Sequence, residues 1–160
     1  EDMADTMRTI AASAHAEMRL LLLELRPMSF ESIGLDELLN QLVIAFLGRH
    51  STLSTDLQVG TMPPLSIEAK NSLYRIAQES LNNIGKHAEA QNAVIKAWAT
   101  DGVVNLTVKD DGKRFDAGKQ SNGHGMHIMR ERAESISAEY RVSSKIGKGT
   151  QVHVRYYIPD

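Results

Sequence analysis

The sequence predicts an α+β protein, a two-layer sandwich in which helices cover one face of a mixed β-sheet. Three observations predict this class. Four stretches have apolar residues at helical spacing, and short segments rich in β-branched residues lie between and after them. Glycine or proline punctuates several of the boundaries. The predicted order is a long helix, a helix, a strand, a helix, two strands, a glycine-bearing loop, a helix and two strands.

The first predicted helix covers residues 3–25. Its apolar positions recur at steps of three or four residues and form a narrow row: Met3, Met7, Ile10, Ala14, Met18, Leu21 and Leu25. Such a narrow row is typical of a coiled coil or a helical bundle, and Pro27 is expected to end the helix. An amphipathic helix that lies on its own domain is the alternative interpretation.

The next elements alternate between helix and strand. A helix over residues 35–47 is expected to end at Gly48, and a strand over residues 53–59 follows it. A third helix is predicted over residues 66–87, with Ser66 as its N-cap. The remaining elements are strands over 93–99 and 103–108 joined by an Asp101-Gly102 turn, a loop over 110–125, a helix over 126–136, and strands over 140–144 and 151–158.

Composition and charge are those of an ordinary globular chain. The 160 residues are 42% hydrophobic and 24% charged, enough to form one compact unit with a real core. The formal charge of -2 argues against non-specific binding to nucleic acid. Because the chain has no cysteine, disulfides and thiolate metal sites are excluded, and we expect a cytoplasmic location. The sequence begins at Glu1 already in helical pattern, so we expect a longer parent protein, which could carry a membrane anchor upstream.

Two polar clusters lie on or directly after predicted regular elements in the second part of the chain. Glu79 and Asn83 are four residues apart on the third helix, so their oxygen atoms share a face and could hold a hard cation or orient a water molecule. Asp110 stands where a strand ends, and its carboxylate could accept a hydrogen bond from an amino group. Gly112 would let a flat ligand approach the backbone.

A third cluster, Gly123-His124-Gly125, leads into the fourth helix, where free N–H groups and the helix dipole favour phosphate oxygens. Each cluster alone also fits a solvated helix face or an ordinary turn. Together they supply an acceptor for an adenine amino group, oxygen ligands for a metal and a phosphate-binding helix start, without a P-loop.

These clusters lie in segments that resemble a known family. The segments are R-I-A-Q-E-S-L-N-N-I-G-K-H-A-E-A, D-D-G-K-R-F, G-H-G-M-H-I-M-R-E-R-A and G-K-G-T. They resemble the N, G1 and G2 boxes of two-component sensor histidine kinases, in the subfamily of nitrate, envelope-stress and membrane-fluidity sensors. The resemblance covers about residues 65–159 and implies the Bergerat fold shared with gyrase and heat-shock chaperone ATPases. Upstream, L-R-P and G-L-D-E-L-L resemble the end of that subfamily's dimerisation and phosphotransfer hairpin.

The resemblance implies roles for individual residues. Asn83 would bind Mg²⁺, and Glu79 would act as a general base or water-orienting acid beside it. The implied nucleotide contacts are Lys86 to a phosphate, His87 near the adenine, Asp110 to the adenine amino group, Gly112 for clearance, Gly123 and Gly125 for phosphate binding and lid movement, and Thr150 on the adenine side.

The resemblance also implies an organisation and an activity. Residues 1–27 would be the second helix of a truncated hairpin that forms a homodimer, and residues 28–160 the catalytic domain that binds ATP and Mg²⁺. The γ-phosphate would pass to a histidine that this sequence lacks, and then to an aspartate in the receiver domain of a response regulator. His15 lies on the wrong arm of the hairpin and lacks a following acidic residue. The chain is therefore expected to bind ATP without phosphorylating itself.

Two positions depart from the family pattern. Arg114 replaces the second glycine of the G1 box, and Ser137-Ala138 replaces a glycine pair after the M-R-E-R-A helix. Arg114 favours an alternative, a nucleotide-sensing or scaffolding module with weak or no kinase activity. A second alternative is another Bergerat ATPase, such as a chaperone or topoisomerase fragment or a serine-directed anti-sigma kinase; the L-R-P and M-R-E-R-A segments argue against it.

Overall fold

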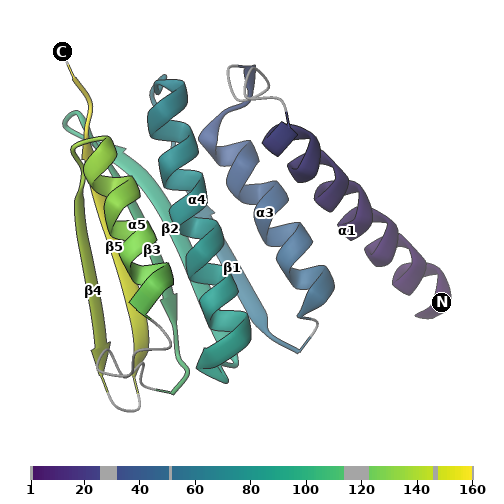
Figure 1. Ribbon diagram of the computed structural model, residues 1–160. Helices are drawn as coiled ribbons and strands as arrows, with labels where there is room; N and C mark the ends of the chain where they lie inside the picture. The colour runs from purple at the N-terminus through teal and green to yellow at the C-terminus, as the bar shows by residue number, and fades with distance from the viewer. Residues whose placement is uncertain (1, 26–31, 51, 114–122, 146–147, 160) are drawn as a thin grey trace.

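The structure, a computed structural model, describes residues 2–25, 32–50, 52–113, 123–145 and 148–159. It confirms the predicted α+β class. Figure 1 shows one layer of helices lying against one face of a twisted sheet. The helices are α1 (Asp2–Leu25), α3 (Leu35–Arg49), α4 (Ile67–Asn83) and α5 (Gly123–Ser135).

The sheet is mixed, as predicted, and has the strand order β1-β2-β3-β5-β4. Its strands are β1 (Ser54–Val59), β2 (Asn92–Thr100), β3 (Val103–Asp110), β4 (Glu139–Lys145) and β5 (Gly149–Tyr157). β1 runs parallel to β2, and the other neighbouring pairs are antiparallel. The tight β2–β3 turn has positive φ angles at Asp101 (51°) and Gly102 (74°), as the predicted hairpin requires.

The core lies between the helices and the inner face of the sheet. Alternate residues of the central strands point inward and are buried, such as Ile95 on β2 and Leu106 on β3. They pack with buried apolar residues of α3 and α4, such as Phe46 and Ile76. Burying each of these large side chains contributes about 1.5–3 kcal/mol. The packing fixes α4 over the sheet, and α5 packs beside it.

α1 lies against α3 at the end of the helix layer (Figure 1). Its described apolar side chains point to solvent: Met3, Met7, Ile10 and Met18 are 56–74% exposed. These four side chains therefore do not pack on the domain itself. Pro27, expected to end the helix, lies outside the described residues. None of the described helices is long and apolar enough to cross a membrane.

Two helix ends differ from the sequence prediction. Gly48 does not end α3, because the helix continues to Arg49 and the N–H of His50 bonds to the carbonyls of Phe46 and Leu47. The third helix begins as predicted, since the Ser66 hydroxyl accepts a hydrogen bond from the N–H of Ala69 (3.1 Å). Its α-helical part ends at Asn83.

A π-helical turn, η1 (Ile84–Ala88), continues from α4. Such wide turns inside helices often mark functional sites. Glu89 ends η1 in the left-handed conformation, with a φ of 47°. α5 begins at Gly123, three residues before the predicted start, so Gly125 lies within its first turn.

Candidate nucleotide-binding site

The first part of the candidate site lies between α4 and the start of α5. A Cβ atom placed on Gly125 would overlap the Glu79 carboxylate and lie 3.6 Å from Asn83 Nδ2. Glu79 and Asn83 are both half-buried. The predicted shared face of Glu79 and Asn83 therefore meets the first turn of α5, where free backbone N–H groups favour anions.

The second part lies at the end of β3. Asp110 is only 4% exposed, and its Oδ1 accepts a hydrogen bond from the N–H of Gly112 (2.8 Å). Burial raises the pKa of Asp110, although the N–H groups of Gly112 and Thr150 oppose the change. Gly149, with a φ of 70°, lies so close that a Cβ there would overlap the Asp110 carbonyl. Asp110 is thus a buried carboxylate with remaining lone pairs for an amino donor.

Asp111 performs a structural task that the sequence interpretation missed. Its carboxylate accepts hydrogen bonds from the backbone N–H groups of Gln91 and Asn92 (both 2.9 Å) and from Asn92 Nδ2 (2.6 Å). These bonds, the Asn92 side chain first, lower the pKa of Asp111. Asp111 therefore ties the segment after β3 to the start of β2, and holds the neighbouring Asp110 in place.

The loop after β3 also contacts η1. The N–H of Lys113 donates to the carbonyl of Ala88 (2.7 Å), and Lys113 Nζ pairs with Glu89 (2.5 Å). A Cβ on Gly112 would overlap the Ala88 carbonyl. Gly112 is thus needed for a close approach of two backbone segments, which brings the Asp110 end of the sheet beside η1.

The other predicted residues lie around these two parts. Lys86 and His87 are exposed on η1, and Gly123 is the first residue of α5. Thr150 lies in β5, with its hydroxyl 3.2 Å from that of Ser144. Arg114 and most of the predicted glycine-bearing loop lie outside the described residues.

Tyr140 is a further polar residue near the site that sequence reasoning missed. Its hydroxyl is buried and has no hydrogen-bond partner within the described ranges. Burial raises the pKa of Tyr140 to about 12; the positive charge of Arg130 opposes this shift, and the negative charge of Glu79 adds to it. The sequence feature that could have predicted this burial is the two-residue alternation of β4, which places Tyr140 and Val142 on the inner face of the sheet.

A metal ion at this site would have few protein ligands. In the parts of the chain that the structure describes, no three His, Cys, Asp or Glu side chains form a group that could hold one. The amide oxygen of Asn83 is a suitable ligand for a hard cation, and phosphate oxygens commonly complete the coordination of Mg²⁺. The residues present therefore fit a cation that arrives with a nucleotide.

The fold and the site define a nucleotide-binding α+β domain without a P-loop, in which the ligand would lie between helices and the end of a central strand. The model of the family described as histidine kinase-, DNA gyrase B- and HSP90-like ATPases matches residues 68–159, more than half of the chain. The chain belongs to this family of ATP-binding domains.

Sensor histidine kinases are among its relatives. The chain is 34% identical over 148 residues to the sensor histidine kinase LiaS of Bacillus subtilis, a match that covers 91% of this chain and 40% of LiaS. The chain thus spans less than half the length of this relative.

Solved structures share the fold. The histidine kinase domain of a blue-light activated kinase from Erythrobacter litoralis has a TM-score of 0.69 at 20% identity, covering 80% of this chain and 63% of that one. Full-length ShkA in complex with AMPPNP has a TM-score of 0.65 at 21% identity, covering 80% and 31%.

Proposed function

We propose that this chain is the ATP-binding catalytic part of a two-component sensor histidine kinase. The whole protein would transfer the γ-phosphate of ATP to a histidine, and from there to an aspartate of a response regulator. The observation that carries the proposal is the buried Asp110 carboxylate at the end of β3, where Gly112 meets η1, the turn that continues from the helix α4 that bears Glu79 and Asn83. The named relative LiaS and the AMPPNP-bound ShkA support it.

Each side chain would make a distinct contribution. Asp110 would accept a hydrogen bond from the adenine amino group, with Thr150 on the same side. Gly112, for which the sequence predicted ligand clearance, would instead keep η1 close beside Asp110, because its Cβ position is filled by the Ala88 carbonyl. Lys86 and His87, both exposed on η1, would approach a phosphate and the adenine respectively.

The phosphate end of the nucleotide would lie between α4 and α5. The first turn of α5, from Gly123 to Gly125, would bind phosphate oxygens through its N–H groups. Asn83 would hold Mg²⁺, which would neutralise charge on the phosphates. Glu79 would accept or orient the proton of the attacking imidazole.

The exposed side chains of Met3, Met7, Ile10 and Met18 on α1 support the proposed domain organisation. Residues 1–27 would form one arm of a dimerisation hairpin, and residues 28–160 the catalytic domain. The row would pack against helices of a second copy, as the narrow spacing of a helical bundle requires. A charge at Ile10, in Ile10→Glu, should shift the chain from dimer to monomer in analytical ultracentrifugation. The exposed Arg8→Glu is the control, and an unchanged dimer in Ile10→Glu would refute this interface.

The nucleotide site is tested by isothermal titration calorimetry with ATP. Asp110→Asn places a donor against the adenine amino donor and should weaken binding by about 1–3 kcal/mol. Asp56→Asn makes the same chemical change at an exposed position on β1 and should leave the affinity unchanged. Equal ATP affinity in wild type and Asp110→Asn would refute the assignment of the adenine site.

The metal and base roles are tested separately. Asn83→Ala should weaken binding of Mg²⁺-ATP more than binding of Mg²⁺-free ADP, because the lost oxygen contacts the metal. Glu79→Gln should keep nucleotide binding and reduce phosphotransfer in a protein that contains the acceptor histidine. Equal losses for both ligands in Asn83→Ala would contradict the metal role.

A further inference from the structure

The face of the sheet opposite the helices is open. α3, α4 and α5 lie on one face, and in the described part of the chain no helix covers the other (Figure 1). The strand register aligns the outward side chains in rows across this face. One row runs from Trp98 on β2 through Asn105 and Arg155 to Glu139 on β4.

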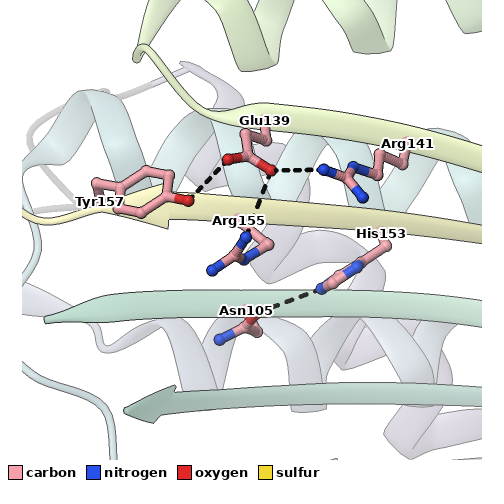
Figure 2. A network of polar contacts seen from close by, with 6 residues as sticks. All are labelled: Asn105, Glu139, Arg141, His153, Arg155 and Tyr157. Atoms are coloured by element: carbon pink, nitrogen blue, oxygen red, sulfur yellow. Dashed lines mark hydrogen bonds and ion pairs between the residues drawn. The ribbon is translucent and has the colours of Figure 1, made fainter. Parts of the chain in front are cut away.

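This outer face carries exposed aromatic side chains, including the only tryptophan of the chain. Trp98 is 37% exposed and stacks with His153, at 6.3 Å between ring centroids and 15° between planes. Tyr157 is 44% exposed, with the Arg155 guanidinium 5.4 Å from its ring centroid. Figure 2 shows His153 directed toward Asn105, with His153 Nε2 and Asn105 Oδ1 3.3 Å apart. Aromatic residues exposed together with hydrogen-bonding groups are typical of interfaces.

The outer face is positively charged, whereas the chain as a whole is negative. Among the strand residues whose side chains the structure describes, those that are charged and point outward are Lys96, Lys109, Arg141, Arg155, Asp56 and Glu139. Four cations and two anions give these side chains a formal charge of +2, whereas the formal charge of the whole chain is -2. His153 adds no charge at neutral pH, because burial and then the nearby arginines lower its pKa.

The two arginines are held in place before any partner binds. Glu139 accepts hydrogen bonds from Arg141 (3.3 Å) and from the Tyr157 hydroxyl (2.7 Å), and it forms an ion pair with Arg155 (3.5 Å), as Figure 2 shows. Each guanidinium has five N–H donors, so donors remain for a second carboxylate. Because the contacts with Glu139 restrict the two guanidinium groups, binding would lose less conformational entropy.

A shallow, open groove of about 510 Å³ adjoins Trp98. It is lined by Leu57, Gln58, Val59, Gly60, Lys96, Ala97 and Trp98. The groove could receive an apolar or aromatic side chain next to the basic residues.

We propose that the outer face binds an acidic segment of a partner protein. Its carboxylates meet the outward basic side chains, Lys96, Lys109, Arg141 and Arg155, while an apolar side chain enters the groove beside Trp98. Tryptophan, tyrosine and arginine are the residues that most often dominate binding energy at protein interfaces. Five strands about 4.8 Å apart and about 20–25 Å long form a face of roughly 400–500 Å² when measured as a flat area. An area of this size is typical of a transient interface. The negative charge of the rest of the chain disfavours a nucleic acid.

The proposed interface and the nucleotide site lie on opposite faces of the sheet. Asp110 points inward, as Leu106 and Val108 do, whereas Asn105 and Lys109 point outward. A partner on the outer face would therefore bind together with ATP. This inference goes beyond the proposed kinase activity and does not depend on it.

The test uses Trp98 fluorescence, which reports on this face alone. The probe is a synthetic twelve-residue peptide of glutamate and leucine with one central phenylalanine, at low salt. We expect a saturable change in Trp98 emission. Affinity should fall at least tenfold in Lys96→Glu/Lys109→Glu, a variant that leaves the Glu139 contacts intact. Arg132→Glu, a charge reversal on α5, should bind as wild type does.

Amide chemical-shift mapping should place the same peptide on β2, β3 and β5, and Asp110→Asn and saturating ATP should leave its affinity unchanged. No Trp98 response at millimolar peptide, or a loss of binding in Asp110→Asn, would overturn the proposal. Tighter binding of a twelve-nucleotide oligothymidylate or of phosphatidylserine vesicles would also overturn it. The proposal would also be overturned if Trp98 emission of the chain alone changed with protein concentration and Lys96→Glu/Lys109→Glu abolished this change. That result would identify a second copy of the chain as the occupant of the face.

Discussion

The end of α5 allows a prediction about a departure from the family pattern. The N–H of Ala138 bonds to the carbonyl of Ala133 and the N–H of Ser137 to that of Glu134, both at 2.9 Å. This pattern is a Schellman motif, and its left-handed residue is Ser137, with a φ of 56°. Glycine is the residue that this position favours, so Ser137→Gly should stabilise the fold.

The size of the effect follows from two opposing contributions. A left-handed conformation costs a residue with a Cβ about 1–2 kcal/mol, a cost that glycine avoids. Glycine loses more chain entropy on folding, which costs about 0.5–1 kcal/mol. The net gain for Ser137→Gly is therefore about 0.5–1 kcal/mol. For a chain of this size the gain corresponds to a rise in Tm of about 1–4 °C.

The assay is urea unfolding followed by circular dichroism, with a thermal scan of the same samples. Ala138→Gly is the matched control, since Ala138 is the adjacent residue and has no positive φ. It should destabilise the fold by about 0.5–1 kcal/mol. Equal or lower stability of Ser137→Gly, or the same gain in both variants, would refute the reasoning from backbone conformation.

Two further variants test residues beside the nucleotide site. Asp111→Ala should lower the free energy of unfolding by about 1 kcal/mol at pH 7. The pKa of Asp111 is lowered in the folded state, so its contribution to stability is present above the unfolded pKa of about 3.9 and is lost as the pH falls through the folded pKa. The urea midpoints of wild type and variant should therefore converge in acid. Tyr140→Phe should leave the free energy of unfolding unchanged or raise it by up to about 1 kcal/mol, because the removed hydroxyl is buried without a partner among the described residues. Tyr74→Phe is the control and should not raise it, because it loses a hydrogen bond from Gln78. The pKa of Tyr140 is raised to about 12 in the folded state, so the wild type should lose stability between about pH 10 and 12. Tyr140→Phe should lose less over the same range. Parallel profiles of stability against pH in the two proteins would contradict this.

The sequence alone predicted the elements whose signals are local. Apolar periodicity predicted the four main helices, the Asp101-Gly102 turn predicted the β2–β3 hairpin, and Ser66 was predicted as an N-cap. Each of these depends on contacts within a few residues of chain. Helix ends were less predictable. Gly48 did not end α3, and the π-turn after Asn83 carries no local signal that periodicity detects.

Motifs in the sequence also named the residues of the candidate site, but they did not say how those residues meet. Only tertiary packing brings the Cα of Gly125 against Glu79, ties Asp111 to Asn92 and leaves the Tyr140 hydroxyl without a partner within the described ranges. The first two contacts join segments 19 or more residues apart, so they depend on how α4, α5 and the sheet pack. The same holds for the outer face, whose rows of side chains arise from the register of four strands. Residue type and spacing are local properties that a sequence carries directly, whereas register and helix packing are decided by the burial of the whole core.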